Sequence, residues 1–207
     1  MASEYLKRTP TSTGNRSVFT WSGWVKISDL SSPIGLFGSY HGSNSRYALL
    51  RIESAGDFYF YTGDFTTGNT TTTNTWVNTV SKFRDFSSWM HITAVYNTTL
   101  AVAEDRFRLY VNGVNQELSI TGSPSQNSFT YINSLYQHTL GAWAEGSSGG
   151  NQDFEGQMSD VFMVDGQALT PDVFGFYKDG DGYMSSGTSK ATDFRPGQWS
   201  PHSPSKI

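Results

Sequence analysis

Hydrophobic and polar residues alternate on both sides of Asn112-Gly113, between Phe107 and Leu118. Asn-Gly favours a tight type I′ turn because both residues tolerate positive φ, so this stretch predicts a β-hairpin. The face expected to be apolar takes Phe107, Leu109, Val111, Val114, Gln116 and Leu118, and the opposite face takes Arg108, Tyr110 and Glu117. A hairpin with one apolar face is expected to lie on a hydrophobic core.

Similar runs recur at short intervals along the chain. Strands are expected at residues 18–27, 34–39, 46–53, 57–63, 75–83, 89–97, 135–143 and 154–169. Turn residues separate these runs, which is typical of sandwiches and not of βαβ units. The pattern predicts an all-β fold, an antiparallel two-sheet jelly-roll sandwich. Only residues 170–177 could be helical, since Thr170 suits an N-cap and Pro171 the first turn, so at most one short helix is expected.

The chain of 207 residues has room for one large all-β domain, which we place at residues 1–177. From residue 178 onward Gly, Ser and Pro are spread through the sequence without periodicity, so residues 178–207 are predicted to form an extended C-terminal arm. Phe194 and Trp199 are the aromatic side chains by which this arm would attach. Attachment to the parent domain and attachment to a neighbouring subunit of an assembly both remain open.

Composition narrows the classes of partner. The net charge is −4 without a basic run, which argues against nucleic acid. The chain has no cysteine, as expected of a protein that matures in a reducing cytoplasm. No segment approaches the roughly 20 apolar residues of a membrane span, and residues 1–15 lack the apolar region of a secretory signal. We therefore expect no membrane insertion and release by lysis.

The acidic residues do not form the paired carboxylates of a glycosidase. Glu104 and Asp105 are adjacent and point to opposite faces of a strand, whereas Asp153 and Glu155 share a face but have no further acidic partner. That last pair is more typical of a solvated strand entry than of a catalytic dyad. No nucleophile elbow is present, and the four histidines are scattered. The sequence predicts no catalytic residues and a protein that is not an enzyme.

Two loops combine aromatic rings with short polar side chains, as saccharide-binding sites do. The candidate glycan-binding residues are Tyr40, His41 and Asn44 in the first loop, and Trp143, Glu145, Asn151 and Gln152 in the second. An alternative is that Tyr40 and Trp143 only cap the ends of the sandwich.

A third polar loop, residues 64–75, is rich in side-chain oxygens. Asp64, Asn69 and Asn74 are its candidate ligands for a hard cation such as Ca²⁺, although no cofactor is the first expectation. The KDGDGY stretch at residues 178–183 lacks the later ligands of a calcium loop and is interpreted as a turn.

Five phrases in order resemble a laminin G-like, concanavalin A-type jelly roll: FTWSGWVKI, WMHITAVYN, RLYVNGV, LGAW and FEGQMSDVFMVDGQALTP. The resemblance covers residues 15 to 172. Sugar or calcium binding is implied only by association with that fold, which does not settle function. Where relatives have an acidic pair in the closing strand, this chain has Ser159-Asp160, which weakens any inherited metal site.

The phrases YLKRTPTSTGNRSVFTWSGWVK and DGQALTPDVFG are similar to the version of this domain in tailed bacteriophages, especially marine ones, as is Trp199 with Pro201. The resemblance implies a virion structural protein, and we expect a non-enzymatic capsid decoration or appendage subunit on the virion surface. Its partners would be other virion proteins, host-surface glycans and further copies of itself. A tail adhesin that recognises host glycans is one alternative, and a polysaccharide-degrading enzyme is another.

Overall fold

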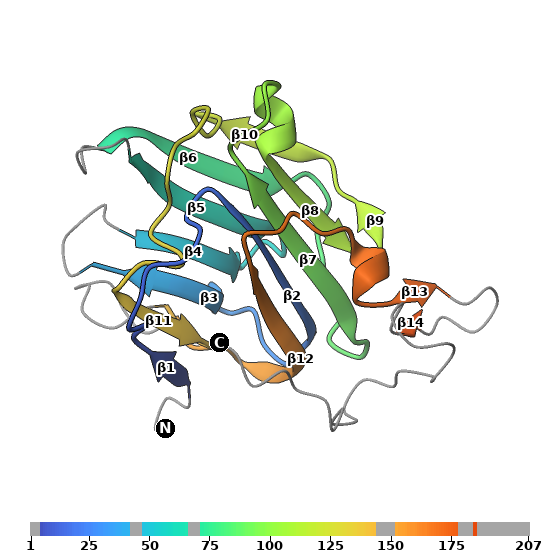
Figure 1. The fold of residues 1–207 in the computed structure, drawn as a ribbon. Coiled ribbons are helices and arrows are strands. Elements are labelled where there is room, and N and C mark those ends of the chain that lie inside the picture. The colour runs from blue at the N-terminus through green and yellow to red at the C-terminus, as the bar shows by residue number, and fades with distance from the viewer. Residues whose placement is uncertain (1–4, 42–46, 66–70, 144–151, 178–183, 186–207) are drawn as a thin grey trace.

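The computed structural model describes residues 5–41, 47–65, 71–143, 152–177 and 184–185. These residues form two stacked antiparallel sheets, shown in Figure 1, which confirms the predicted all-β sandwich. No helix in these ranges is long and apolar enough to cross a membrane. Because the arm lies almost wholly outside these ranges, the domain boundary at residue 177 and the attachment through Phe194 and Trp199 stay predictions.

The larger sheet has seven strands. In spatial order they are β1 (Leu6–Arg8), β11 (Gln137–Leu140), β3 (Ile34–Tyr40), β4 (Tyr47–Ile52), β5 (Phe58–Phe65), β6 (Thr71–Thr79) and β10 (Leu118–Thr121). The β6 strand begins earlier than the predicted run at residues 75–83, and it pairs with β5 as far as Phe65 opposite Thr71. Much of the predicted loop 64–75 is therefore strand, in keeping with the strand preference of the β-branched threonines there.

The smaller sheet has five strands. In spatial order they are β12 (Gly156–Asp165), β2 (Val18–Ile27), β7 (Met90–Asn97), β8 (Phe107–Val111) and β9 (Val114–Asn115). A separate pair, β13 (Phe176–Tyr177) and β14 (Met184–Ser185), follows the sandwich in the chain. The predicted helix at residues 170–177 is only the 3₁₀ turn η2, Pro171–Val173, and the chain then enters β13. The Thr170 hydroxyl donates to the Asp172 carboxylate and does not cap the turn.

The core lies between the sheets and is built from aromatic rings. Phe60 of β5 stacks on Phe107 of β8 with 4.4 Å between ring centroids, and Trp21 of β2 stacks on Phe37 of β3 at 6.4 Å. Tyr96 of β7 also lies 5.9 Å from Phe60. These contacts join one sheet to the other, because each pair takes one ring from either layer.

The predicted hairpin is present, with Asn112 and Gly113 at positive φ in its turn. The second arm of the hairpin does not have the buried apolar face that the sequence predicted. Val114 is 63% exposed, because β9 is an edge strand only two residues long. The chain then crosses to the seven-stranded sheet, where Leu118 lies opposite Thr79 in β10.

Arg106 holds two loops together at one end of the sandwich. This side chain is 8% exposed and belongs to the 3₁₀ turn η1, Ala103–Arg106. Its guanidinium donates to the backbone oxygens of Leu100, Ala101 and Pro124, each at 2.8 Å. Without Arg106, three backbone carbonyls would lose their donor, and the bond to Pro124 among them is buried.

We predict that Arg106→Met lowers the free energy of unfolding by about 3 kcal/mol, because three hydrogen bonds from a buried charged group are lost. Arg108→Met is the control two residues away. Arg108 makes a 2.7 Å ion pair with Asp105 in which both side chains are more than 40% exposed. Its loss is expected to cost less than about 1 kcal/mol. Urea unfolding measures both, and equal effects would contradict the prediction.

Candidate functional site

Four aromatic rings form a continuous row on the outer face of the seven-stranded sheet; this ring row consists of Trp143, Tyr47, Tyr61 and Trp76. Successive side chains of a strand point to opposite faces. Phe60 of β5 and Val77 of β6 are paired in the core, so Tyr61 and Trp76, which are paired next to them, face outward. Tyr47 of β4 faces outward for the same reason, one position before the buried Ala48.

The rings contact one another in sequence across the sheet. Tyr47 stacks on Tyr61 with 4.4 Å between ring centroids, Trp76 lies 5.7 Å from Tyr61, and Trp143 lies 5.3 Å from Tyr47. Tyr61 at the centre is only 3% exposed, whereas Trp76 at one end is 38% exposed. Tyr47 and Trp143 are partly exposed. The row therefore offers ring surface to solvent on either side of a buried centre.

Trp143 reaches the row because its segment lies directly on β3. The Gly35 amide donates to the Gln152 carbonyl at 2.9 Å, and the Trp143 amide donates to the same oxygen at 3.2 Å. A Cβ at position 35 would lie 2.6 Å from the Trp143 nitrogen, so only glycine permits this approach. The Trp143 indole Nε1 is buried and has no hydrogen-bond partner among the described residues.

Hydrogen-bonding and charged groups lie beside the row. The Tyr61 hydroxyl donates to Asn74 Oδ1 at 3.1 Å. Burial raises the pKa of Tyr61 to about 12 and also raises the pKa of Tyr47, so both phenols stay neutral at physiological pH. Arg51 of β4 stacks on Tyr59 with its guanidinium carbon 4.4 Å from the ring centroid.

The structure brings some of the predicted glycan residues to the row and separates others. Trp143 is in the row, and Gln152 accepts a hydrogen bond from Arg51 at 3.0 Å. Tyr40 is nearly buried on the outer face opposite Tyr47. His41 instead packs against Tyr136, 4.1 Å between centroids. Asn44, Glu145 and Asn151 lie outside the described residues.

Tyr47, Tyr61 and Trp76 were not among the predicted glycan-binding residues, which were chosen from the composition of loops. A signal for them existed, because each alternates with core residues in a predicted strand. Recognising it required knowing that β4, β5 and β6 are neighbours, which the strand pattern does not tell.

Calcium binding at residues 64–75 stays a prediction. Asn69 lies outside the described residues, as does the side chain of Asp64, and Asn74 Oδ1 already accepts the Tyr61 hydroxyl. Within the described ranges, no three His, Asp or Glu side chains gather as metal ligands would. Ser159 Oγ donates to the Asp160 carboxylate at 2.7 Å, and burial raises the pKa of Asp160.

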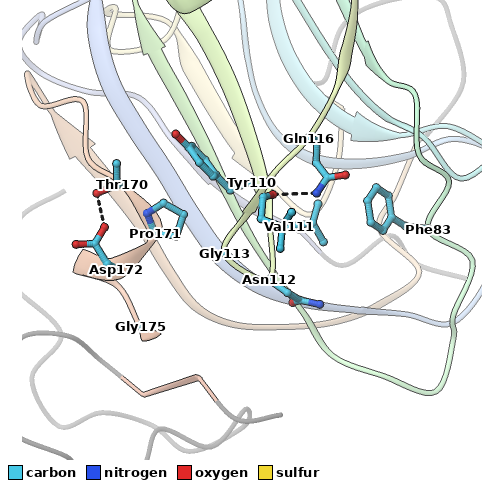
Figure 2. Close-up of a pocket in the computed structure, with 11 residues that line it drawn as sticks. Phe83, Tyr110, Val111, Asn112, Gly113, Gln116, Thr170, Pro171, Asp172 and Gly175 are labelled. Carbon is cyan, nitrogen blue, oxygen red and sulfur yellow. Dashed lines mark hydrogen bonds between the residues drawn. The ribbon is translucent and has the colours of Figure 1, made fainter. Parts of the chain in front are cut away.

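A separate hollow of about 900 Å³ lies at the β8–β9 hairpin, away from the ring row. Figure 2 shows the hairpin turn between Phe83 on one side and the Thr170–Asp172 turn on the other. Two polar side chains that line the hollow hydrogen-bond to residues nearby in the sequence: Gln116 donates to the Val114 carbonyl at 2.8 Å, and Thr170 donates to Asp172. Asp172 is the one carboxylate among the described residues that line it.

Ser22 and His91 form a buried pair on the outer face of the five-stranded sheet. Ser22 Oγ lies 2.8 Å from His91 Nε2, a distance that would suit a nucleophile and its base. Ser22 is fully buried, however, and the His91 ring lies beside Trp24 at 5.0 Å and near Phe174 at 6.4 Å. No described residue hydrogen-bonds to His91 Nδ1, so the orienting group of a triad is absent from this part of the chain. We interpret the pair as structural.

Burial lowers the pKa of His91 from 6.5 to about 4. The unfolded chain takes up a proton below about pH 6.5 and the folded protein does not until about pH 4, so stability present above pH 6.5 is lost on acidification through that window. At pH 5 we expect a loss of about 2 kcal/mol from this group.

Urea unfolding at pH 7.5 and pH 5.0 tests this expectation. The difference in unfolding free energy between the two pH values should be smaller in His91→Gln than in the wild type. The comparison uses the pH dependence, so any constant destabilisation by the variant cancels. The buried His138, whose pKa is also lowered mainly by burial, should leave a residual dependence in both proteins. An unchanged pH dependence in His91→Gln would contradict the assignment.

The sequence model of the concanavalin A-like lectin/glucanases superfamily matches residues 2–173. No curated protein sequence matches the chain. Among solved structures, domains LG4-5 of the mouse laminin alpha1 chain match with a TM-score of 0.56 and 11% identity, over 81% of this chain and 42% of that one. The CBM40 of the Ruminococcus gnavus IT-sialidase matches with a TM-score of 0.52 and 14% identity, over 81% and 95%.

A third solved structure is a Bacteroides ovatus protein described as a candidate for carbohydrate binding. It matches with a TM-score of 0.53 and 19% identity, over 88% of this chain and 48% of that one. This chain therefore spans less than half the length of the laminin and Bacteroides ovatus chains. At these identities the likenesses establish the fold, and they leave ligands to be argued from the site itself.

Proposed function

Because the chain belongs to the concanavalin A-like lectin/glucanases superfamily, we propose that it is a non-catalytic domain that binds glycans through the ring row. The observation that carries this proposal is the unbroken contact from Trp143 through Tyr47 and Tyr61 to Trp76. Flat aromatic faces pack against the apolar faces of sugar rings, and neighbouring amides and hydroxyls serve sugar hydroxyl groups. Asn74 and Gln152 are such amides beside the row.

Two of the structural neighbours support this proposal by analogy. One is a CBM40 of a sialidase, and the other is a candidate carbohydrate-binding protein. The support is an analogy of fold, and the ring row supplies the argument from this chain's own residues.

We also propose that the domain does not catalyse hydrolysis of the glycans it binds. Glycoside hydrolysis uses two carboxyl groups on either side of the scissile bond. Glu53, the carboxylate beside Arg51, is held in an ion pair at 2.5 Å. The release of reducing ends from a bound polysaccharide would overturn this part of the proposal and support the alternative of a polysaccharide-degrading enzyme.

We expect Trp143→Ala and Trp76→Ala each to weaken glycan binding about tenfold, because each removes one end of the stacking surface. A glycan array identifies the ligand class, and calorimetric titration of the best binder measures the change. Phe86→Ala is the control, since Phe86 is another exposed aromatic residue, 47% exposed, outside the ring row. Unaltered affinity in both tryptophan variants, with the fold intact by circular dichroism, would refute the assignment of the site.

We further propose a biological setting for this domain: the surface of a tailed-phage virion, where it would be a capsid decoration or appendage subunit. Its support is the similarity of the opening and closing phrases to phage versions of the domain. The subunit would be made in the host cytoplasm, released by lysis, and bound to other virion proteins. An additional proposal is Ca²⁺ binding at residues 64–75, with Asp64, Asn69 and Asn74 as the candidate ligands.

Immunogold labelling of intact particles tests the virion proposal. We expect label on assembled virions, because a structural subunit co-purifies with the particle. Label on the head supports a decoration subunit, and label confined to the tail tip supports the alternative of a receptor-binding adhesin. Particles that carry no label, while the lysate does, would exclude a virion role.

A further inference from the structure

Arg51 is the cation next to the ring row, and its charge is already neutralised. Burial raises the pKa of Tyr47 and of Tyr59, and the positive charge of Arg51 partly offsets each rise. The guanidinium is therefore close enough to act electrostatically on Tyr47 of the ring row. Arg51 and Glu53 lie on the outer face of β4 and just beyond its end, with side chains 18% and 21% exposed. The pair therefore borders the proposed site and is largely withdrawn from solvent.

All three nitrogens of the Arg51 guanidinium contact side-chain oxygens. Its Nε lies 2.7 Å and its Nη2 2.5 Å from Glu53 Oε1. Its Nη1 donates to Gln152 Oε1 at 3.0 Å, and its planar face lies on the Tyr59 ring. A guanidinium binds a ligand carboxylate best through two parallel N–H donors. Here Glu53 takes the edge formed by Nε and Nη2, and Gln152 takes one donor of Nη1.

We infer that the ring row selects neutral saccharides over carboxylated ones, because Glu53 occupies the guanidinium that would otherwise bind a sugar carboxylate. This inference rests on the proposed glycan-binding function. A carboxylated sugar would have to displace Glu53 and would meet its negative charge at close range. A neutral sugar needs only the ring faces and the amides, and its binding should be nearly independent of salt.

The test compares hexose oligosaccharides with hexuronic-acid oligosaccharides on a glycan array, followed by titration of the best binder of each class. We expect the wild type to favour the neutral probe at least about tenfold. In Glu53→Gln, Arg51 keeps its charge and loses its ionised partner. The affinity for the hexuronic-acid probe should then rise about fivefold at low salt, and the gain should vanish near 0.5 M salt.

Two further variants assign the effect to Arg51. Glu104→Gln removes the same charge from η1, on the side of the five-stranded sheet, and should leave the ratio of the two affinities unchanged. Adding Arg51→Met to Glu53→Gln should abolish the gain. A gain in Glu104→Gln equal to that in Glu53→Gln would show a general charge effect and overturn the inference.

The outcomes separate this inference from the proposed function. Binding of both probe classes with equal affinity, or tighter binding of the hexuronic-acid probe by the wild type, would overturn the neutral selectivity and leave glycan binding intact. Binding of neither class by any variant would overturn the proposed function, and the selectivity with it.

Discussion

The stacking of aromatic rings between the two sheets is the interaction on which the rest of the structure depends. Phe60 meets Phe107 and Trp21 meets Phe37, each pair bridging the layers. Since side chains alternate along a strand, placing Phe60 in the core places Tyr59 and Tyr61 on the outside of the same sheet. The outer ring row follows from the inner stack, because a one-residue slip of β5 would bury one set and expose the other.

In the part of the chain that the structure describes, the outer face of the seven-stranded sheet is only partly covered by other segments. The segment around Trp143 and Gln152 lies on β3, where Gly35 leaves room for its backbone. Leu49, also on this outer face, is fully buried. Trp76 on β6 remains exposed. Exposed aromatic surface on a single domain often marks a binding site, which is consistent with the ligand site proposed at the ring row.

Several polar groups that could support chemistry hold the fold together instead. Arg106 donates to three backbone carbonyls, and His91 is buried against Ser22. Arg51 is bound by Glu53 and Gln152 beside the ring row. Burying a charged or titratable group without a partner is costly, so such groups are satisfied within the protein. Among the described residues beside the ring row, ring surface and amides are the groups that a ligand could meet, and we therefore propose binding.

The sequence by itself determined the fold class, most of the strands and the hairpin at Asn112-Gly113, because alternation and turn chemistry are local properties of the chain. It also placed Trp143 and Gln152 among the candidates. Only the tertiary structure decided that Tyr47, Tyr61 and Trp76 join Trp143 while His41 turns to Tyr136. The physical reason is strand order, because residues on three different strands become neighbours only when the sheet assembles. The alternation of residues along one strand does not specify which other strands it pairs with.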